Sequence, residues 1–161
     1  MNPTDILSHP PVRRLGCQVI AFNPAGEVLV VDPEYKSGLT LPGGSALQGE
    51  APNEAAARHL ALETGLVLDL WQILAVDYVP EGVYPEGINL VFNGGMLTDR
   101  QVERIAVPPI AKSRLHGFRF VPMTEVSTCT EPYQRRRIRQ AYNALNMAKA
   151  LPLLLRGELV C

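Results

Sequence analysis

The segment from 39 to 66 constrains the fold more than any other part of the sequence. A short apolar run, Leu39-Thr40-Leu41, predicts a strand that leads into Pro42-Gly43-Gly44, where glycine permits close approaches that a side chain would forbid. From Pro52 to Thr64 the residues are mostly Ala, Leu, Glu and Arg, which favour helix, and Gly65 follows where a left-handed cap is expected. We therefore predict a strand, a ligand-facing loop and a helix over 52–64.

The rest of the chain alternates between strand-like and helix-like patterns. Apolar and β-branched runs predict strands over 15–22, 27–31, 67–79, 88–97 and 118–121, and composition predicts a second helix over 131–150. The 161 residues are 47% hydrophobic, which suffices for one compact core. We predict a single α/β domain over 1–161 with a mixed sheet sandwiched by helices, an N-terminal extension over 1–14, and a C-terminal helix and tail over 131–161.

The charge balance limits the partners. Fifteen Lys and Arg residues and sixteen Asp and Glu residues give a net charge of −1, so we expect no binding of long nucleic acid. The absence of a roughly 20-residue apolar run and of a signal pattern predicts a cytoplasmic protein with a small-molecule ligand and no membrane partner. The second helix carries a basic stripe, which predicts a solvated face or a homodimer contact; its residues are Arg135, Arg136, Arg137 and Arg139.

The three cysteines indicate no disulfide framework and no thiolate metal site. Cys17, Cys129 and Cys161 lie far apart in the sequence and have no C-x-x-C spacing. We interpret Cys17 as a strand residue, Cys129 as a loop residue and Cys161 as part of the chain end.

The spacing Gly44-x5-Glu50-x7-Arg58, continued to Glu63 and Gly65, resembles the Nudix box, G-x5-E-x7-R-E-U-x-E-E-x-G-U with U aliphatic. The preceding Leu-Pro-Gly-Gly is also similar to the entry of that box. The resemblance implies a Nudix-type α/β/α sandwich with a mixed β-sheet and a hydrolase activity on a small-molecule diphosphate, nucleoside or other. It also implies a divalent metal, Mg²⁺ or Mn²⁺.

Two positions depart from the Nudix pattern. His59 and Leu62 stand where the family has Glu, so Glu63 alone remains of three carboxylates. At about 100° per residue these three side chains share one face of the helix. The loss of two anionic oxygen ligands weakens a site for Mg²⁺, and metal would then come with the substrate, be a softer ion such as Zn²⁺ on His59 and Glu63, or be absent.

Other residues complete the candidate site. Glu50 and Arg58 are predicted to form a structural ion pair, with Gly44 and Gly65 shaping the ends of the box, and Glu63 to be a catalytic and metal-binding carboxylate. His59 has two interpretations, a hydrogen-bonded helix residue or a general base. The predicted substrate-binding residues are Gly43, the cleft-lining Leu62, Arg114, which stands where relatives have an acidic residue, and Glu86 in the loop over the cleft; Trp71, Tyr78 and Tyr84 lie near the same region.

Three hypotheses about function follow. The first is a Nudix hydrolase-like protein with a divergent metal site and weak or altered diphosphate hydrolysis, which is our principal prediction. The second is a Nudix-fold enzyme that uses His59 and Glu63 for acid–base chemistry without metal. The third is a ligand-binding module that keeps the cleft and has lost catalysis.

Overall fold

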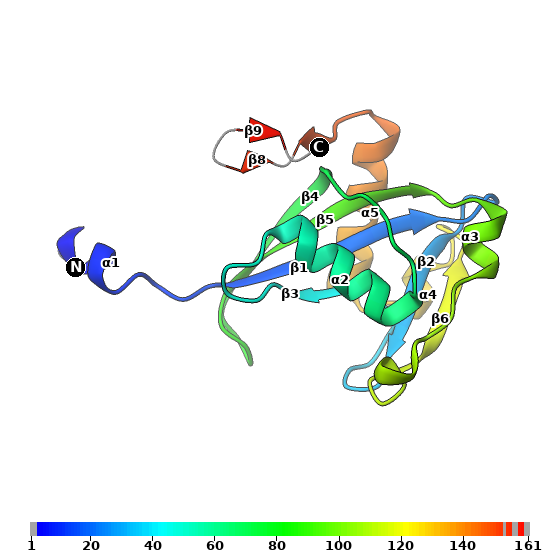
Figure 1. Cartoon of the computed structure of the whole chain (residues 1–161), viewed down its shortest axis with the longest axis horizontal. Helices are drawn as coiled ribbons and strands as arrows, with labels where there is room; N and C mark the ends of the chain where they lie inside the picture. Colours follow the sequence, from blue (N-terminus) through cyan, green and yellow to red (C-terminus); the bar gives the residue numbers. More distant parts are fainter. Residues whose placement is uncertain (1–2, 153, 156–157, 160–161) are drawn as a thin grey trace.

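The computed structural model describes residues 3–152, 154–155 and 158–159, arranged as shown in Figure 1. The strands are β1 (Arg14–Phe22), β2 (Val28–Pro33), β3 (Gly43–Ser45), β4 (Gln72–Val79), β5 (Gly87–Met96), β6 (Leu115–Val121), β7 (Leu151–Pro152), β8 (Leu154–Leu155) and β9 (Glu158–Leu159). The helices are α1 (Pro3–Ser8), α2 (Pro52–Thr64), α3 (Asp99–Glu103), α4 (Val126–Cys129) and α5 (Pro132–Asn146), with a 3₁₀ turn η1 at Pro109–Ala111.

The main sheet is mixed, as the sequence predicts. Among the described residues it has seven strands in the order β6-β2-β1-β5-β4-β7, with β3 paired to β1 outside this path. Strands β1 and β5 run parallel at its centre, and the other pairs are antiparallel. In this register Gly16 of β1 lies beside Asn89 of β5, and Asn89 lies beside Asp77 of β4.

Helices α2 and α5 cover opposite faces of the sheet (Figure 1). Because side chains alternate along a strand, Cys17 and Val19 of β1 pack with Leu60 of α2, whereas Ile20 packs with Ile138 of α5. Both clusters are almost fully buried, which confirms the predicted sandwich. Polar residues on the α5 face of β1 are therefore placed between the sheet and α5.

The bounds of α2 agree with the sequence prediction. Pro52 occupies the first turn, and the Glu54 carboxylate accepts a hydrogen bond from the Ala51 amide at 3.4 Å, although Ala51 has no capping oxygen of its own. At the other end Gly65 adopts φ = 76° and donates to the Ala61 carbonyl. Both ends of the helix are thus defined by local main-chain contacts.

Several element predictions were wrong in position. Residues 39–41 form only a single bridge from Thr40 to Val31, and the short strand is Gly43–Ser45, which begins just after Pro42. Residues 67–71 are not a strand, because Leu66 and Leu70 bury their side chains under α2 without ladder hydrogen bonds. Helix α5 ends at Asn146, before Ala148 takes a positive φ of 50°.

Cys161, predicted as a chain-end cysteine, lies outside the described residues. Among the residues that are described, no helix is long and apolar enough to cross a membrane.

Candidate functional site

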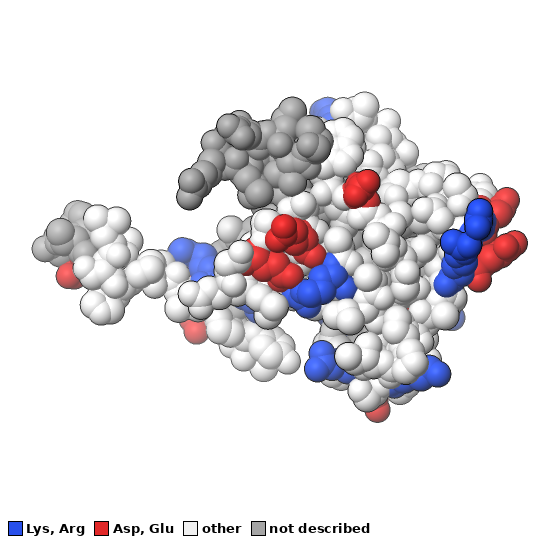
Figure 2. Space-filling model, viewed as in Figure 1, with Lys and Arg blue, Asp and Glu red and all other residues white. Residues whose placement is uncertain are grey.

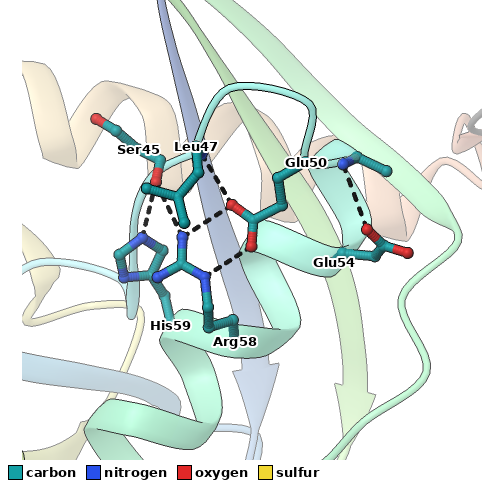
Figure 3. Close-up of polar contacts among 7 residues, drawn as sticks. Ser45, Leu47, Glu50, Glu54, Arg58 and His59 are labelled. Carbon is teal, nitrogen blue, oxygen red and sulfur yellow. Dashed lines mark hydrogen bonds and ion pairs between the residues drawn. The ribbon is translucent and has the colours of Figure 1, made fainter.

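Helix α2 is tied to the loop that contains β3 by three of its side chains. The Glu63 carboxylate accepts a hydrogen bond from the Gly43 amide at 3.0 Å. One turn earlier, Nε2 of His59 lies 3.0 Å from the Ser45 carbonyl oxygen, and Nη2 of Arg58 donates to the same oxygen at 3.3 Å (Figure 3). The polar face of α2 therefore binds the main chain of residues 43–45.

His59 is packed against this loop rather than projecting into open space. A carbonyl oxygen only accepts, so Nε2 carries the proton in the contact with Ser45. A methyl group on Gly44 would collide with the imidazole ring, which explains why glycine stands there. Burial lowers the pKa of His59 below its usual value, which favours the neutral ring. This arrangement matches the hydrogen-bonded interpretation of His59.

Glu63 is the most perturbed carboxylate of the site. Burial raises its pKa to about 7, and the hydrogen bond from Gly43 opposes that shift. The positive charge of Lys36 also lowers the pKa, but burial outweighs both effects. At neutral pH Glu63 is therefore divided between its protonated and ionised forms.

Glu50 and Arg58 form the ion pair that the sequence predicts. Nε and Nη2 of Arg58 donate to the two Glu50 oxygens at 2.7 and 2.9 Å, a bidentate geometry (Figure 3). Glu50 also accepts from the Leu47 amide at 2.8 Å. The Arg58 guanidinium, with that amide, lowers the pKa of Glu50 to about 2. Both carboxylate oxygens are thus occupied by protein donors, and the pair holds the loop before α2 in shape.

These donors do not fit a divalent metal in the way the resemblance implies. Mg²⁺ and Mn²⁺ prefer several carboxylate or water oxygens, whereas the Nudix-box positions 59, 62 and 63 offer only the Glu63 carboxylate, beside the aliphatic Leu62 and the engaged His59. Glu50 is held by Arg58. Within the part of the chain that the structure describes, no three His, Cys, Asp or Glu residues gather to hold an ion.

A cavity of about 530 Å³ opens beside this loop, between β1, β5 and the start of α5. We call it the ligand pocket; its walls are Arg14, Gly16, Cys17, Gln18, Tyr35, Lys36, Thr40, Gly43, Gly44, Ser45, Val79, Tyr84, Asn89, Tyr133, Gln134 and Arg137. Among these lining residues three are cationic and none is acidic. The main-chain segment held by α2 thus forms one wall of the pocket.

A buried polar network forms the floor of the ligand pocket. Arg137, only 6% exposed, binds Oδ2 of Asp77 through Nε and Nη2 at 2.7 Å each, and its Nη1 donates to Gln18 at 2.8 Å. Gln18 in turn donates to the Thr40 hydroxyl at 3.1 Å. The prediction of a solvated basic stripe was therefore wrong for Arg137, because its charge is compensated by a partner on β4.

The structure does not gather all the predicted substrate-binding residues. Gly43 lines the ligand pocket, whereas Leu62, 38% exposed, Arg114 and Glu86 are not among its walls. Glu86 pairs with Arg13 at 2.8 Å and accepts from the Tyr78 hydroxyl at 2.5 Å. A role in binding for these three residues stays a prediction.

Only some of the aromatic residues and cysteines singled out in the sequence line the ligand pocket. Tyr84 lines the pocket, whereas Trp71 and Tyr78 are exposed outside it. Cys17 also lines the pocket, but burial raises its thiol pKa to about 11, which makes it a poor nucleophile.

The polar residues of the pocket floor were missed by sequence reasoning. Gln18 and Asn89 interrupt apolar strands, and both are buried at less than 10% exposure. A buried amide in a strand that is otherwise Val, Ile and Leu was the available signal, because an unpaired polar side chain there is costly. On the face that carries α2, Figure 2 shows acidic side chains next to basic ones.

Comparisons with known proteins agree on the fold. The family model described as NUDIX domain matches residues 12–143. A MutT protein from Methanosarcina mazei Go1 superposes with a TM-score of 0.68 at 19% identity, over 87% of this chain and 98% of that one. The NUDIX domain of Shewanella oneidensis NrtR, solved with ADP ribose, gives 0.69 at 16% identity, over 90% and 99%.

A third structure, described as a UDP-X diphosphatase, gives a TM-score of 0.68 at 12% identity, over 92% of this chain and 73% of that one. At these identities the structural matches establish the fold alone. A search of curated proteins finds no significant match.

Proposed function

Since the chain belongs to the NUDIX domain family, we propose that it binds a small-molecule diphosphate in the ligand pocket and hydrolyses it weakly, without a metal cradle of its own. Members of this family are hydrolases and typically use divalent metals. The observation that carries the proposal is the set of bonds from Glu63, His59 and Arg58 to the main chain of residues 43–45. Those bonds use the face of α2 that the resemblance assigns to metal.

The lining of the ligand pocket supports an anionic ligand. Arg14 and Lys36 lie in its walls, and no acidic residue accompanies them among the lining residues. Phosphate groups are bound well by such cations. Three tyrosines in the walls offer rings against which a planar group packs; they are Tyr35, Tyr84 and Tyr133. The related NUDIX domain solved with ADP ribose is consistent with this ligand class.

The donor set of α2 supports weak hydrolysis. Efficient use of Mg²⁺ needs several oxygen ligands, and His59 and Leu62 supply none. Metal-dependent hydrolysis would therefore require the diphosphate to supply most of the oxygen ligands of the metal ion.

The test measures binding and product together. Thermal shift with nucleoside, sugar and isoprenoid diphosphates detects the ligand, and phosphate release with Mg²⁺ or Mn²⁺ detects turnover. We expect stabilisation by at least one diphosphate, slow release by the native chain, and faster release after the paired change His59→Glu and Leu62→Glu. Absence of binding to every diphosphate would refute the proposal, and rapid hydrolysis by the native chain would refute its metal-site part.

Acid–base chemistry without metal is the second candidate, and one observation favours it. A carboxyl group with a pKa near 7 suits proton transfer at neutral pH, and Glu63 has such a pKa. Turnover in the presence of EDTA, with a pH profile abolished in Glu63→Gln, would support it. Binding without any product would instead support a ligand-binding module.

A further inference from the structure

Two buried amide side chains in the ligand pocket lack hydrogen-bond partners. Asn89 is 6% exposed and its Nδ2 has no acceptor, and Gln134 is 2% exposed and its Oε1 has no donor. Both residues line the ligand pocket, one from β5 and one from α5. An unpartnered buried polar group is costly, so such groups in native proteins are normally paired.

The contacts of Gln18, Arg137 and Asp77 are mutual, whereas Nε of Arg14, another lining residue, is also buried without a partner. Gln18 and Arg137 satisfy each other, and Arg137 also binds Asp77. Asn89 lies between Gly16 and Asp77 in the sheet register. It makes no side-chain hydrogen bond to either residue, because glycine has no side chain and the Asp77 carboxylate accepts from Arg137. The partners of Asn89 and Gln134 must therefore come from outside the network.

Gly16 sets the position of the Asn89 amide. A methyl group at Gly16 would collide with Oδ1 of Asn89, so the amide oxygen lies directly over the glycine. A glycine in the middle of a strand lowers strand stability, and close approach of another group is a common reason for one. The side chain of Asn89 thus lies across β1 at the pocket wall.

We propose that Asn89 and Gln134 determine the specificity of the ligand pocket by binding the uncharged part of the ligand. Asn89 donates to an acceptor, Gln134 accepts from a donor, and Gly16 is a positioning residue for Asn89. A planar ring with an amide or amidine edge presents such an acceptor beside a donor. This inference rests on the proposed function, because it concerns the same pocket.

A small motion brings the two groups to the ligand. Solvent does not reach Nδ2 of Asn89 or Oε1 of Gln134. The terminal torsions of Asn and Gln are soft, and rotation about them turns either atom toward the pocket that the residue already lines. Because neither atom has a hydrogen bond in the ligand-free chain, binding a ligand group there breaks no existing hydrogen bond of these atoms.

The test compares ligands with and without a ring. ADP and UDP carry an amidine or amide edge, whereas inorganic pyrophosphate and isopentenyl diphosphate do not. Titration calorimetry should give ADP or UDP at least about tenfold tighter binding than either control, as one or two hydrogen bonds to buried groups provide. Asn89→Leu, Gln134→Met and Gly16→Ala should each weaken that binding about tenfold and leave pyrophosphate binding unchanged.

Stability separates this role from a structural one. Replacing an unpartnered buried amide by an apolar side chain of similar shape is neutral or stabilising, so Asn89→Leu and Gln134→Met should keep or raise the Tm of the ligand-free chain. A loss of Tm would show that the amides bind a buried water or a protein group, which overturns the inference. The matched control is Gln140→Met, on an exposed position of α5.

The outcomes also separate this inference from the proposed function. If pyrophosphate and isopentenyl diphosphate bind as tightly as ADP and UDP, the inference fails and the proposed function stands. If none of the four binds, both fail.

Discussion

Replacing Glu63 by Gln should change how the stability of the protein depends on pH. Burial raises the pKa of Glu63 in the folded chain to about 7, against 4.5 for the exposed group. The folded state therefore holds a proton that the unfolded state releases, and this contribution to stability is complete below pH 4.5 and is lost as pH rises through about 7. A pKa difference of about 2.5 corresponds to about 3 kcal/mol, an upper value because Glu63 is partly exposed.

Urea denaturation between pH 4 and 8 in EDTA measures this effect. The free energy of unfolding of Glu63→Gln should gain on that of the native chain as pH rises, because the variant has no carboxylate to bury. The amide oxygen introduced there still accepts the bond from Gly43. His59, whose pKa is lowered, acts with the opposite sign in both proteins and cancels in the difference. Glu81→Gln, at an exposed loop position, is the control. Parallel curves for the native chain and Glu63→Gln would refute the reasoning.

Three further perturbations test the packing of the site. Gly44→Ala should destabilise the chain by about 1–3 kcal/mol because the methyl collides with His59, and His59→Ala in the same chain should recover part of that loss, as thermal unfolding of the two variants will show. Arg137→Leu should cost about 1–3 kcal/mol in chemical denaturation, since it leaves buried Gln18 and half-exposed Asp77 without their donor; an unchanged midpoint would contradict the network. Cys17 should resist iodoacetamide at pH 8 in the folded chain and react only after unfolding, as mass spectrometry of the labelled peptide will show. Labelling of Cys17 in the folded chain would contradict its burial.

Sequence patterns predict local elements well where the chemistry is local. The bounds of α2 follow from Pro52 at its first turn, a run of helix formers, and Gly65 in the left-handed region. The Glu50–Arg58 pair likewise follows from the spacing of the Nudix box. These features depend on residues fewer than fifteen positions apart.

The ligand pocket could not be predicted in this way, because it joins residues from distant parts of the chain. Arg137 looks like part of a surface stripe until α5 is laid against β4, where Asp77 is its partner 60 residues away. Gln18 lies 119 residues from the same arginine. The strand predicted at 39–41 was misplaced for a related reason, since the pairing of Gly43–Ser45 with β1 is a tertiary contact that no local pattern encodes.

The choice between the two interpretations of His59, a hydrogen-bonded helix residue or a general base, also depends on tertiary contacts. Its place on the helix is fixed by the sequence, but its use depends on what faces that helix. The facing group is the Ser45 carbonyl, with Gly44 leaving room for the ring. A histidine there therefore helps to hold the loop, and the same loop forms a wall of the ligand pocket.

The account depends most on how the polar face of α2 is used, and titration of the ligand-free protein with Mn²⁺, followed by electron paramagnetic resonance, tests this most directly. We predict no saturable uptake tighter than about 1 mM, because positions 59, 62 and 63 of α2 offer only the Glu63 carboxylate and the Gly43 amide already donates to it. Saturable binding of one or more Mn²⁺ ions per chain, abolished by Glu63→Gln, would contradict the account.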